Sequence, residues 1–287
     1  MGNIPVRVNK MNQISLDTVC ASLAYAMGIE PPRYAADPSA ALTQYIDSVL
    51  GDKRVDRVLM YNPDAIGQWV AEKYPHFLRE VTDSTELALP LCSVTPSVTP
   101  ACFGTMYTGA QPAIHGIQAY EKPVIRIDTL FDALIRAGKK PIIIADPKCS
   151  MSHIYLERDM DYIAVSGVAN VNAAAAKVIL EDKHDFVVVY NGNFDYRMHR
   201  SGCETPETLA ELRYNALTFA MLSQMVSENW QNHNTLVGFA MDHGCHDVEP
   251  FVAKKDGQMR YATHGSDMPE DLNIVHHYKV YKAACGK

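Results

Sequence analysis

The fold expected for this chain is decided by the stretch Phe186-Val187-Val188-Val189-Tyr190-Asn191-Gly192-Asn193-Phe194-Asp195-Tyr196-Arg197-Met198-His199. Its first five residues form a continuous apolar run, which is typical of a strand that is buried on both faces of a sheet. Polar and ionisable residues follow this run directly. In α/β sheets, ligands bind at the carboxyl ends of the strands, so the stretch predicts a strand that ends at a functional site.

Similar apolar runs recur along the chain, and helix-like segments separate them. The further runs expected to be strands cover residues 58–61, 89–92, 141–145, 162–165, 236–241 and 274–280. We expect one helix to begin after Asp128 as N-cap and to stop at Gly138, and a long helix to begin at Thr205-Pro206. The alternation predicts a three-layer α/β/α sandwich with a mostly parallel central sheet.

Composition narrows the class of protein. The chain has 287 residues, of which 47% are hydrophobic and 21% charged, and its net charge is −7. These values are typical of a globular protein, and they disfavour a basic groove for nucleic acid. The apolar runs are too short to span a membrane, and the amino-terminal residues lack a signal-peptide or myristoylation pattern. The sequence carries no signal for an oligomeric state.

The cysteines favour a reduced, cytoplasmic protein. Seven are present without a Cys-x-x-Cys pair or regular spacing: Cys20, Cys92, Cys102, Cys149, Cys203, Cys245 and Cys285. An odd, scattered set of this kind indicates buried free thiols rather than a disulfide framework.

Metal-ligand side chains follow several of the expected strands. They are Asp64, Asp195, His199, Asp242 and His243, and a Ser/Thr-rich segment, residues 93–99, follows another strand. Each motif alone is explained better by a cap, a turn or a surface ion pair. Together they lie where chemistry is expected, and mixed Asp/His sets suit zinc, manganese or iron.

The segment that begins at Thr99 resembles the nucleophile segment of the alkaline phosphatase superfamily, and it is closest to the nucleotide pyrophosphatase/phosphodiesterase branch. The shared pattern comprises Thr99, Thr108-Gly109, Pro112 and His115-Gly116-Ile117. The remaining family elements follow in order: Asp64, Asp195 with His199, Asp242-His243-Gly244, and His264-Gly265. The resemblance covers the chain from about Val55 to its end.

This resemblance implies a phosphohydrolase with two divalent metal ions, most simply Zn²⁺, with Mn²⁺ or Fe as alternatives. One ion would be held by Asp195, His199 and His264. The other would be held by Asp64, Asp242 and His243, with the Thr99 hydroxyl beside it. Thr99 would then act as the nucleophile, through a covalent phospho-threonine, on a small phosphorylated substrate. That substrate would be a phosphodiester, a nucleotide pyrophosphate or a phosphomonoester.

Other readings stay open. The same site would suit a phosphonate hydrolase or a phosphotransferase, and a non-catalytic homologue would bind metal and phosphate without turnover. A sulfatase is disfavoured, because Thr99 cannot be converted to formylglycine. Cys102 stands where the branch usually has a phosphate-binding Asn, and we interpret it as a small buried thiol. His115 is interpreted as a structural residue. Side chains next to the motifs are candidates for substrate recognition: Tyr107, Asn193, Tyr196 and Arg197.

The motifs predict a single domain over residues 1–287. The stretch between Thr99 and Asp195 reads as core strands and helices, which excludes a large cap and leaves room for a small lid within residues 148–159. Residues 1–54 are expected to form a helical segment packed on the core. Its helix, within residues 14–28, resembles an element that the family often carries after its last metal-binding His. A circular permutation and an unrelated helical extension are the two explanations that stay open.

Overall fold

The computed structural model describes residues 10–253 and 257–284 and contains a central seven-stranded sheet. The strands of this sheet are β1 (Arg57–Pro63), β2 (Leu87–Cys92), β3 (Pro141–Ala145), β4 (Asp161–Ala164), β5 (Phe186–Asn191), β6 (Thr235–Phe239) and β9 (Asn273–Tyr281). Their order is β2-β9-β6-β1-β5-β3-β4. Only β9 is antiparallel to its neighbours, so the other six strands run in the same direction. A separate hairpin pairs β7 (His246–Val252) with β8 (Met259–Thr263).

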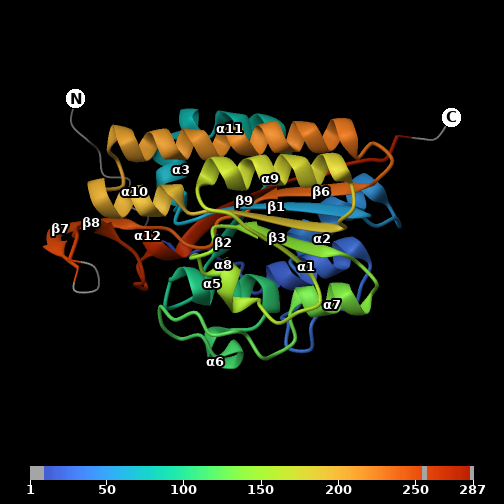
Figure 1. Cartoon of the computed structure of the whole chain (residues 1–287), viewed down its shortest axis with the longest axis horizontal. Coiled ribbons are helices and arrows are strands. Elements are labelled where there is room, and N and C mark those ends of the chain that lie inside the picture. Colours follow the sequence, from blue (N-terminus) through green and yellow to red (C-terminus); the bar gives the residue numbers. More distant parts are fainter. Residues whose placement is uncertain (1–9, 254–256, 285–287) are drawn as a thin grey trace.

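Helices cover both faces of the sheet, which makes the predicted three-layer sandwich (Figure 1). One layer contains α9 (Val168–Glu181) and α11 (Pro206–Asn229). The opposite layer contains α1 (Thr18–Met27), α2 (Ala40–Leu50), α5 (Thr99–Thr108) and α7 (Leu130–Arg136). The shorter helices are α3 (Gln68–Lys73), η1 (Pro75–Phe77), α4 (Arg79–Ser84), α6 (Pro112–His115), α8 (Met151–Ile154), α10 (Asn193–Ser201) and α12 (Pro269–Leu272).

The expected strands are all present, and one helix start differs from the expectation. The N-cap of α7 is Thr129 rather than Asp128. The Thr129 hydroxyl accepts a hydrogen bond from the backbone N–H of Asp132, and the Asp132 carboxylate accepts one from the backbone N–H of Thr129. Asp128 instead forms an ion pair with Arg136, the last residue of α7. A reciprocal capping box satisfies two backbone N–H groups, whereas a single cap satisfies one, which explains the shift by one residue.

The amino-terminal segment packs on the core. Leu16, Val19 and Leu23 are fully buried and belong to the same hydrophobic cluster as β1 and β5. Just before α1, the backbone N–H of Asn12 donates to the Asn273 side chain at the start of β9. The segment therefore lies beside the strand that the permutation hypothesis requires, and that hypothesis stays a prediction.

The strand order explains where polar residues gather. The carboxyl ends of β1, β2, β5 and β6 meet at one edge of the sheet, together with the amino end of the antiparallel β9. The hairpin β7–β8 and the helix α10 lie at this same end of the molecule (Figure 1). Every candidate residue named from the sequence follows one of these strands or precedes β9, so the topology brings them to a common place.

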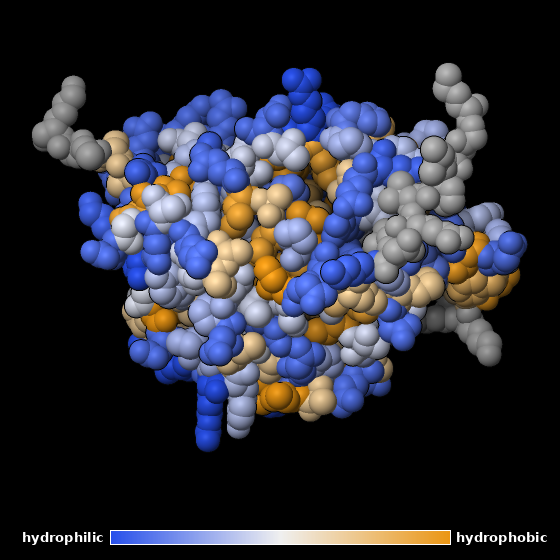
Figure 2. All heavy atoms as spheres, turned by 180° about the vertical axis from the view of Figure 1, so that it is seen from behind, coloured by the Kyte–Doolittle hydropathy of each residue, from blue (hydrophilic) through white to orange (hydrophobic). Residues whose placement is uncertain are grey.

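The surface mixes polar and apolar residues. On the face seen in Figure 2, hydrophobic residues gather near the centre and hydrophilic residues surround them. Within the described residues, no helix combines the length and the apolar character needed to cross a bilayer. The six described cysteines are free thiols, and Cys285 lies outside the described residues.

Candidate active site at the carboxyl edge of the sheet

Thr99 lies beside a cluster of three ionisable side chains that follow two neighbouring strands. Asp64 follows β1, and Asp242 and His243 follow β6, while Thr99 is the first residue of α5. The Thr99 Oγ1 atom is 3.4 Å from Asp64 Oδ2 and 3.4 Å from His243 Nε2. His243 Nε2 in turn lies 3.3 Å from Asp64 Oδ1 and 3.3 Å from Asp242 Oδ2. All four side chains are buried, so we call Asp64, Asp242 and His243 the buried donor group.

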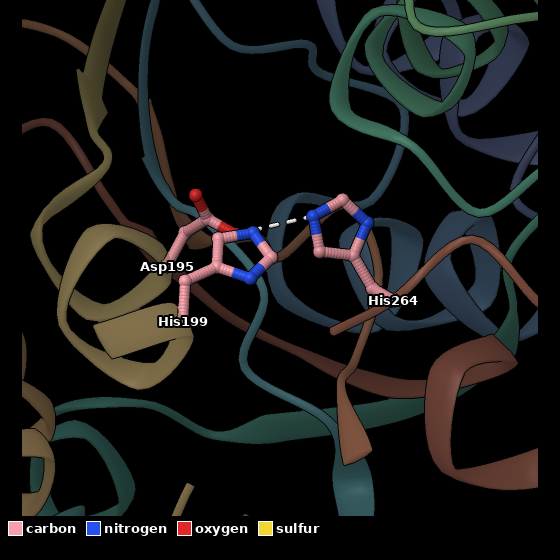
Figure 3. Close-up of side chains that lie close together, drawn as sticks. All are labelled: Asp195, His199 and His264. Carbon is pink, nitrogen blue, oxygen red and sulfur yellow. Dashed lines mark ion pairs between the residues drawn. The ribbon is translucent and has the colours of Figure 1, made fainter. Parts of the chain in front are cut away.

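A second set of three side chains lies beside the first. Asp195 and His199 are one turn apart on α10, and His264 follows β8 (Figure 3). Asp195 Oδ1 is 3.3 Å from His199 Nε2 and 3.2 Å from His264 Nε2. These three residues are partly exposed, and we call them the open donor group. The i, i+4 spacing on one helix face places Asp195 and His199 together, whereas only the tertiary fold delivers His264.

The two donor groups are neighbours. The rings of His243 and His264 are stacked with their centroids 4.1 Å apart, and the rings of His199 and His264 are 5.1 Å apart. His264 therefore connects the groups. The structure brings together all seven residues that the resemblance named.

Each of the three imidazoles is held through the same ring atom. The Nδ1 atom of His199 lies 2.8 Å from the carbonyl oxygen of Ala262, and that of His264 lies 2.9 Å from the carbonyl oxygen of Ser97. His243 Nδ1 lies 2.9 Å from the carbonyl oxygen of Gly244. A carbonyl oxygen can only accept a hydrogen bond, so Nδ1 carries a proton in all three rings. This leaves Nε2 of each neutral ring as a lone pair that faces the carboxylates.

The electrostatics of the buried donor group disfavour two neighbouring negative charges. Burial, reinforced by the charge of Asp195, raises the pKa of Asp64 to about 7. Burial and Asp64 raise the pKa of Asp242 well above its usual range. Burial, together with the nearby His264, lowers the pKa of His243 to about 3, so this ring is neutral at physiological pH. Carboxylates in such a place gain from a nearby positive charge.

The open donor group attracts positive charge. Burial acts to raise the pKa of Asp195, but His199 and His264 hold it well below its usual range. Burial acts against a charge on His264, yet the hydrogen bond and the charge of Asp195, with help from Asp64, raise the pKa of His264 to about 9. The field of the surrounding carboxylates therefore favours a cation at this position.

The donor atoms fit divalent metal ions. Each group supplies one or two carboxylates and one or two imidazole Nε2 atoms within 4.8 Å of one another. Among the described residues, Asp242 Oδ2 is a buried oxygen that accepts no hydrogen bond. A buried carboxylate oxygen without a partner is costly, and a metal ion is the partner that best matches neighbouring imidazole lone pairs. Three protein donors per ion leave coordination positions open, as catalytic sites require.

Sequence reasoning missed Tyr190 as a functional residue. Its hydroxyl donates a hydrogen bond to Asp64 Oδ2, so it holds one oxygen of a donor carboxylate. Tyr190 is nearly buried and comes near the end of β5, where the apolar run suggested only a core residue. The signal that could have found it is its position near the carboxyl end of a central strand.

Two clefts open beside the donor groups. One has a volume of about 630 Å³ and is lined by His199, His264 and Arg200 among others, and the other has a volume of about 490 Å³ and is lined by Tyr190 and Asn193. Tyr196 and Asp195 line both clefts.

Of the four candidate recognition residues, two line the clefts and two do not. Tyr196 is 55% exposed and faces both clefts, and Asn193 lines the smaller one. Tyr107 is fully buried and donates its hydroxyl proton to Asn62, so its expected role in recognition is wrong. The apolar interior between α5 and the sheet encloses its ring, which explains the error. Arg197 lines neither of the two clefts.

Two other interpretations from the sequence are confirmed by position. Cys102 is fully buried, and its sulfur accepts a hydrogen bond from Ser93, so it offers nothing to a ligand. The His115 ring packs against Gly104, where a Cβ would lie 2.8 Å from its Cε1 atom, and bonds with the Thr105 hydroxyl. Both residues serve the packing of α5.

Comparisons with known proteins agree with this architecture. No family model and no curated sequence matches the chain. Among solved structures, murine ectonucleotide pyrophosphatase/phosphodiesterase 5 is similar with a TM-score of 0.60 and 13% identity, over 77% of this chain and 87% of that one. The human form gives a TM-score of 0.57 over the same shares.

A phosphonate-cleaving enzyme is also similar. Phosphonoacetate hydrolase from Sinorhizobium meliloti 1021, in complex with phosphonoacetate, matches with a TM-score of 0.51 and 16% identity, over 70% of this chain and 59% of that one. The chain shares its fold with these solved structures, which agrees with the alkaline phosphatase-like fold expected from its motifs. Two nucleotide pyrophosphatase/phosphodiesterases are among the structures that it resembles.

Proposed function

We propose that this chain is a two-metal hydrolase of phosphoric esters or anhydrides that uses Thr99 as its nucleophile. The observation that carries the proposal is the position of Thr99 Oγ1, 3.4 Å from both Asp64 and His243 and beside a second donor group. A buried threonine with a purely structural role has no reason to face a carboxylate and an imidazole nitrogen. A nucleophilic hydroxyl, which must lose its proton, does gain from such neighbours.

The donor groups would each hold one divalent ion, for which Zn²⁺ suits the mixed oxygen and nitrogen donors. Asp64, Asp242 and His243 would hold the ion next to Thr99, and Asp195, His199 and His264 would hold the other. When bound, such ions supply the positive charge that lowers the pKa of a neighbouring hydroxyl and neutralises phosphoryl oxygens. This explains how a chain with a net charge of −7 can bind an anionic substrate.

In this proposal Thr99 attacks phosphorus. It lies at the amino end of α5, a helix of 10 residues, where the backbone N–H groups and the helix dipole favour negative charge. The Thr99 oxygen would form a bond to phosphorus as the bond to the leaving group breaks. A phosphomonoester would then give a phospho-threonine, and a phosphodiester or nucleotide pyrophosphate would give a threonine adduct that keeps the remaining substituent, such as a nucleotidyl-threonine. Water would then cleave this ester and restore the hydroxyl. The Asp64 carboxylate and the His243 ring, which both lie 3.4 Å from the hydroxyl, would hold Thr99 in position.

The clefts favour a substrate larger than inorganic phosphate. Tyr196 lines both, and Arg200 packs over its ring at 3.6 Å, so an aromatic face and a cation flank the open donor group. A phosphodiester or a nucleotide pyrophosphate would use both. The similarity to phosphonoacetate hydrolase supports a phosphonate as the second candidate substrate for the same site.

The test combines metal content with turnover. The purified protein is stripped with a chelator, reloaded with Zn²⁺ or Mn²⁺, and assayed on chromogenic phosphomonoesters and phosphodiesters and on phosphonoacetate. We expect the diester to be cleaved fastest and Thr99→Ala to lower kcat at least ~10³-fold, because the covalent route is lost. Thr99→Ser, which keeps a hydroxyl, is the matched control and should retain measurable activity.

Acid-quenched wild-type protein should carry a covalent adduct on Thr99 that mass spectrometry locates. The adduct is a phosphate after reaction with a phosphomonoester, and a phosphoryl group with its remaining ester substituent after reaction with a phosphodiester. Full activity in Thr99→Ala would refute the nucleophile. Activity that survives complete removal of metal would refute the two-metal mechanism, and no turnover by the loaded protein on the whole panel would favour a non-catalytic binding protein.

A further inference from the structure

Two cysteines, which neither the catalytic proposal nor the motifs use, lie side by side next to the active site. Cys203 follows α10, and Cys245 precedes β7. They are 42 positions apart in sequence, yet their Sγ atoms are 3.2 Å from each other. Both side chains are completely buried. Among the described residues, no other pair of cysteines has its sulfur atoms in contact.

The backbone on either side of this pair is already fixed. The backbone N–H of Cys203 donates to Asp247 Oδ1 at 2.7 Å, which ties the segment after α10 to the start of β7. The carbonyl oxygen of Cys245 accepts a hydrogen bond from the Trp69 indole at 2.8 Å. A disulfide places its sulfurs about 2.05 Å apart, so the present thiols need to approach by only about 1 Å. Rotation of the two side chains can supply a movement of this size without displacing the backbone.

We propose that Cys203 and Cys245 are a cross-linking site and form an intramolecular disulfide. A low-molecular-weight disulfide of the glutathione type is the oxidant. The thiolate of one cysteine attacks it, forming a mixed disulfide and releasing one glutathione thiolate. The second cysteine thiolate then attacks the mixed disulfide and releases the other. The two protons that the cysteines lose end on the two glutathione molecules. Because the folded pair is inaccessible, the exchange takes place during folding, before the segments close over it.

The cross-link would join the segments that carry the two donor groups. Cys203 lies two residues beyond the end of α10, which carries Asp195 and His199, and Cys245 lies two residues after His243. A covalent tie between these segments fixes the open donor group relative to the buried one. It also closes a long loop and so restricts the unfolded chain more than the folded one, which stabilises the fold.

The experiment refolds the full chain from denaturant in a mixture of oxidised and reduced glutathione, and in parallel in excess dithiothreitol. Free thiols are blocked with N-ethylmaleimide in denaturant, and the digest is analysed by mass spectrometry without reduction. We expect one peptide pair, linked through Cys203 and Cys245 and lighter by two hydrogen atoms than its separate parts, in the oxidised sample only. The oxidised protein should unfold about 5 °C higher than the reduced protein.

Three variants and two contrary outcomes complete the test. Cys203→Ser and Cys245→Ala should each lose both the linked pair and the difference in unfolding temperature. Cys149→Ser removes a thiol that has no cysteine partner among the described residues, so it should keep both. Recovery of Cys203 and Cys245 as separate maleimide adducts in the oxidised wild type would overturn the proposal, and so would linkage of either to a different cysteine. Neither result depends on hydrolytic activity.

Discussion

At the scale of single residues, the orientation of the histidines is the most informative feature of the site. Three imidazoles from three different segments each donate a hydrogen bond from Nδ1 to a backbone carbonyl oxygen. They are those of His199, His243 and His264. A carbonyl oxygen can only accept a hydrogen bond, so the ring must be the donor. The bond therefore fixes both the tautomer and the plane of the ring. All three Nε2 atoms consequently face carboxylates, which is an arrangement suited to a cation and poorly suited to a neutral polar core.

Tyr190 is expected to act through Asp64. The change Tyr190→Phe removes the hydroxyl that donates to Asp64 Oδ2 and leaves that oxygen without its partner. We expect Zn²⁺ to bind roughly 10–100-fold more weakly, because removing a group that orients a metal ligand typically lowers metal affinity by this factor. Isothermal titration calorimetry measures the affinity. The control is Tyr155→Phe, a buried phenol that donates to the Phe103 carbonyl, and it should bind metal normally. Equal affinity in both variants would contradict the role of Tyr190.

At the scale of elements, the site depends on how closely three backbones approach one another. A Cβ on Gly244, directly after His243, would collide with the backbone carbonyl of Glu270 in α12, and one on Gly67 would lie 2.8 Å from the same oxygen. Glycine at both positions lets the loops after β1 and β6 pack against α12. The Asp-His-Gly element therefore combines two donor side chains with a packing requirement.

The capping box of α7 gives a test of the fold that is independent of the site. Thr129→Ala deletes a fully buried hydroxyl that accepts from the Asp132 backbone N–H. We expect the free energy of unfolding to fall by about 1 kcal/mol, as is typical for loss of an N-cap. Urea unfolding followed by circular dichroism measures it. Thr82→Ala, an exposed threonine in α4, is the control, and a loss of equal size there would contradict the capping explanation.

At the scale of the whole molecule, one hydrophobic core runs from α1 to β9, and the donor residues from Asp64 to His264 stand at one end of it. One hydrophobic core therefore joins the segments that carry both donor groups, and the single-domain organisation stays a prediction. Such an arrangement couples ligand binding to global stability, because a bound ion contacts segments that are far apart in sequence.

Metal binding is expected to raise the unfolding temperature of the whole chain. Saturating Zn²⁺, at about 100-fold its dissociation constant, should raise it by about 5 °C relative to chelated protein, since the ions bind only the folded state. Differential scanning fluorimetry measures the shift. The variant Asp195→Asn should lose part of it, because this variant weakens the open donor group. The absence of any shift with Zn²⁺, Mn²⁺ and Fe²⁺ would contradict the two metal sites.

Acid is expected to destabilise the fold through buried neutral histidines away from the donor groups. Burial lowers the pKa of His276 to about 3, below its ordinary value of 6.5. A depressed pKa means that the contribution of His276 is complete above pH 6.5 and is lost as the pH falls toward 3. His276→Gln should therefore be less stable than the wild type at pH 7, and this deficit should shrink by about 1 kcal/mol per pH unit below pH 6.

The measurement is chemical unfolding of metal-free protein at several pH values. His76→Gln, which changes an exposed histidine, serves as the control and should follow the wild type throughout. A deficit that stays constant with pH would contradict the assignment of a neutral buried His276.

Much of the fold was predictable because the strands are buried on both faces. A strand such as β5 is apolar at every position, and its pattern stands out without any knowledge of its neighbours. The N-cap of α7 was less predictable, since Asp128 and Thr129 are both good caps and only the reciprocal bond with Asp132 decides between them. Tyr107 was mistaken for a recognition residue because its motif neighbours are functional, whereas its own ring points into the core.

The sequence by itself determined the strand–helix alternation, the short motifs and the identity of the seven candidate site residues, since these depend on local pattern and order along the chain. The tertiary structure alone decided what those residues do to one another. It set the 4.1 Å stacking of His243 on His264, the bond from Tyr190 to Asp64, and the contact of Cys203 with Cys245. The physical reason is that strand order, and not sequence separation, decides which strand ends meet. Distances, burial and pKa shifts exist only once they have met.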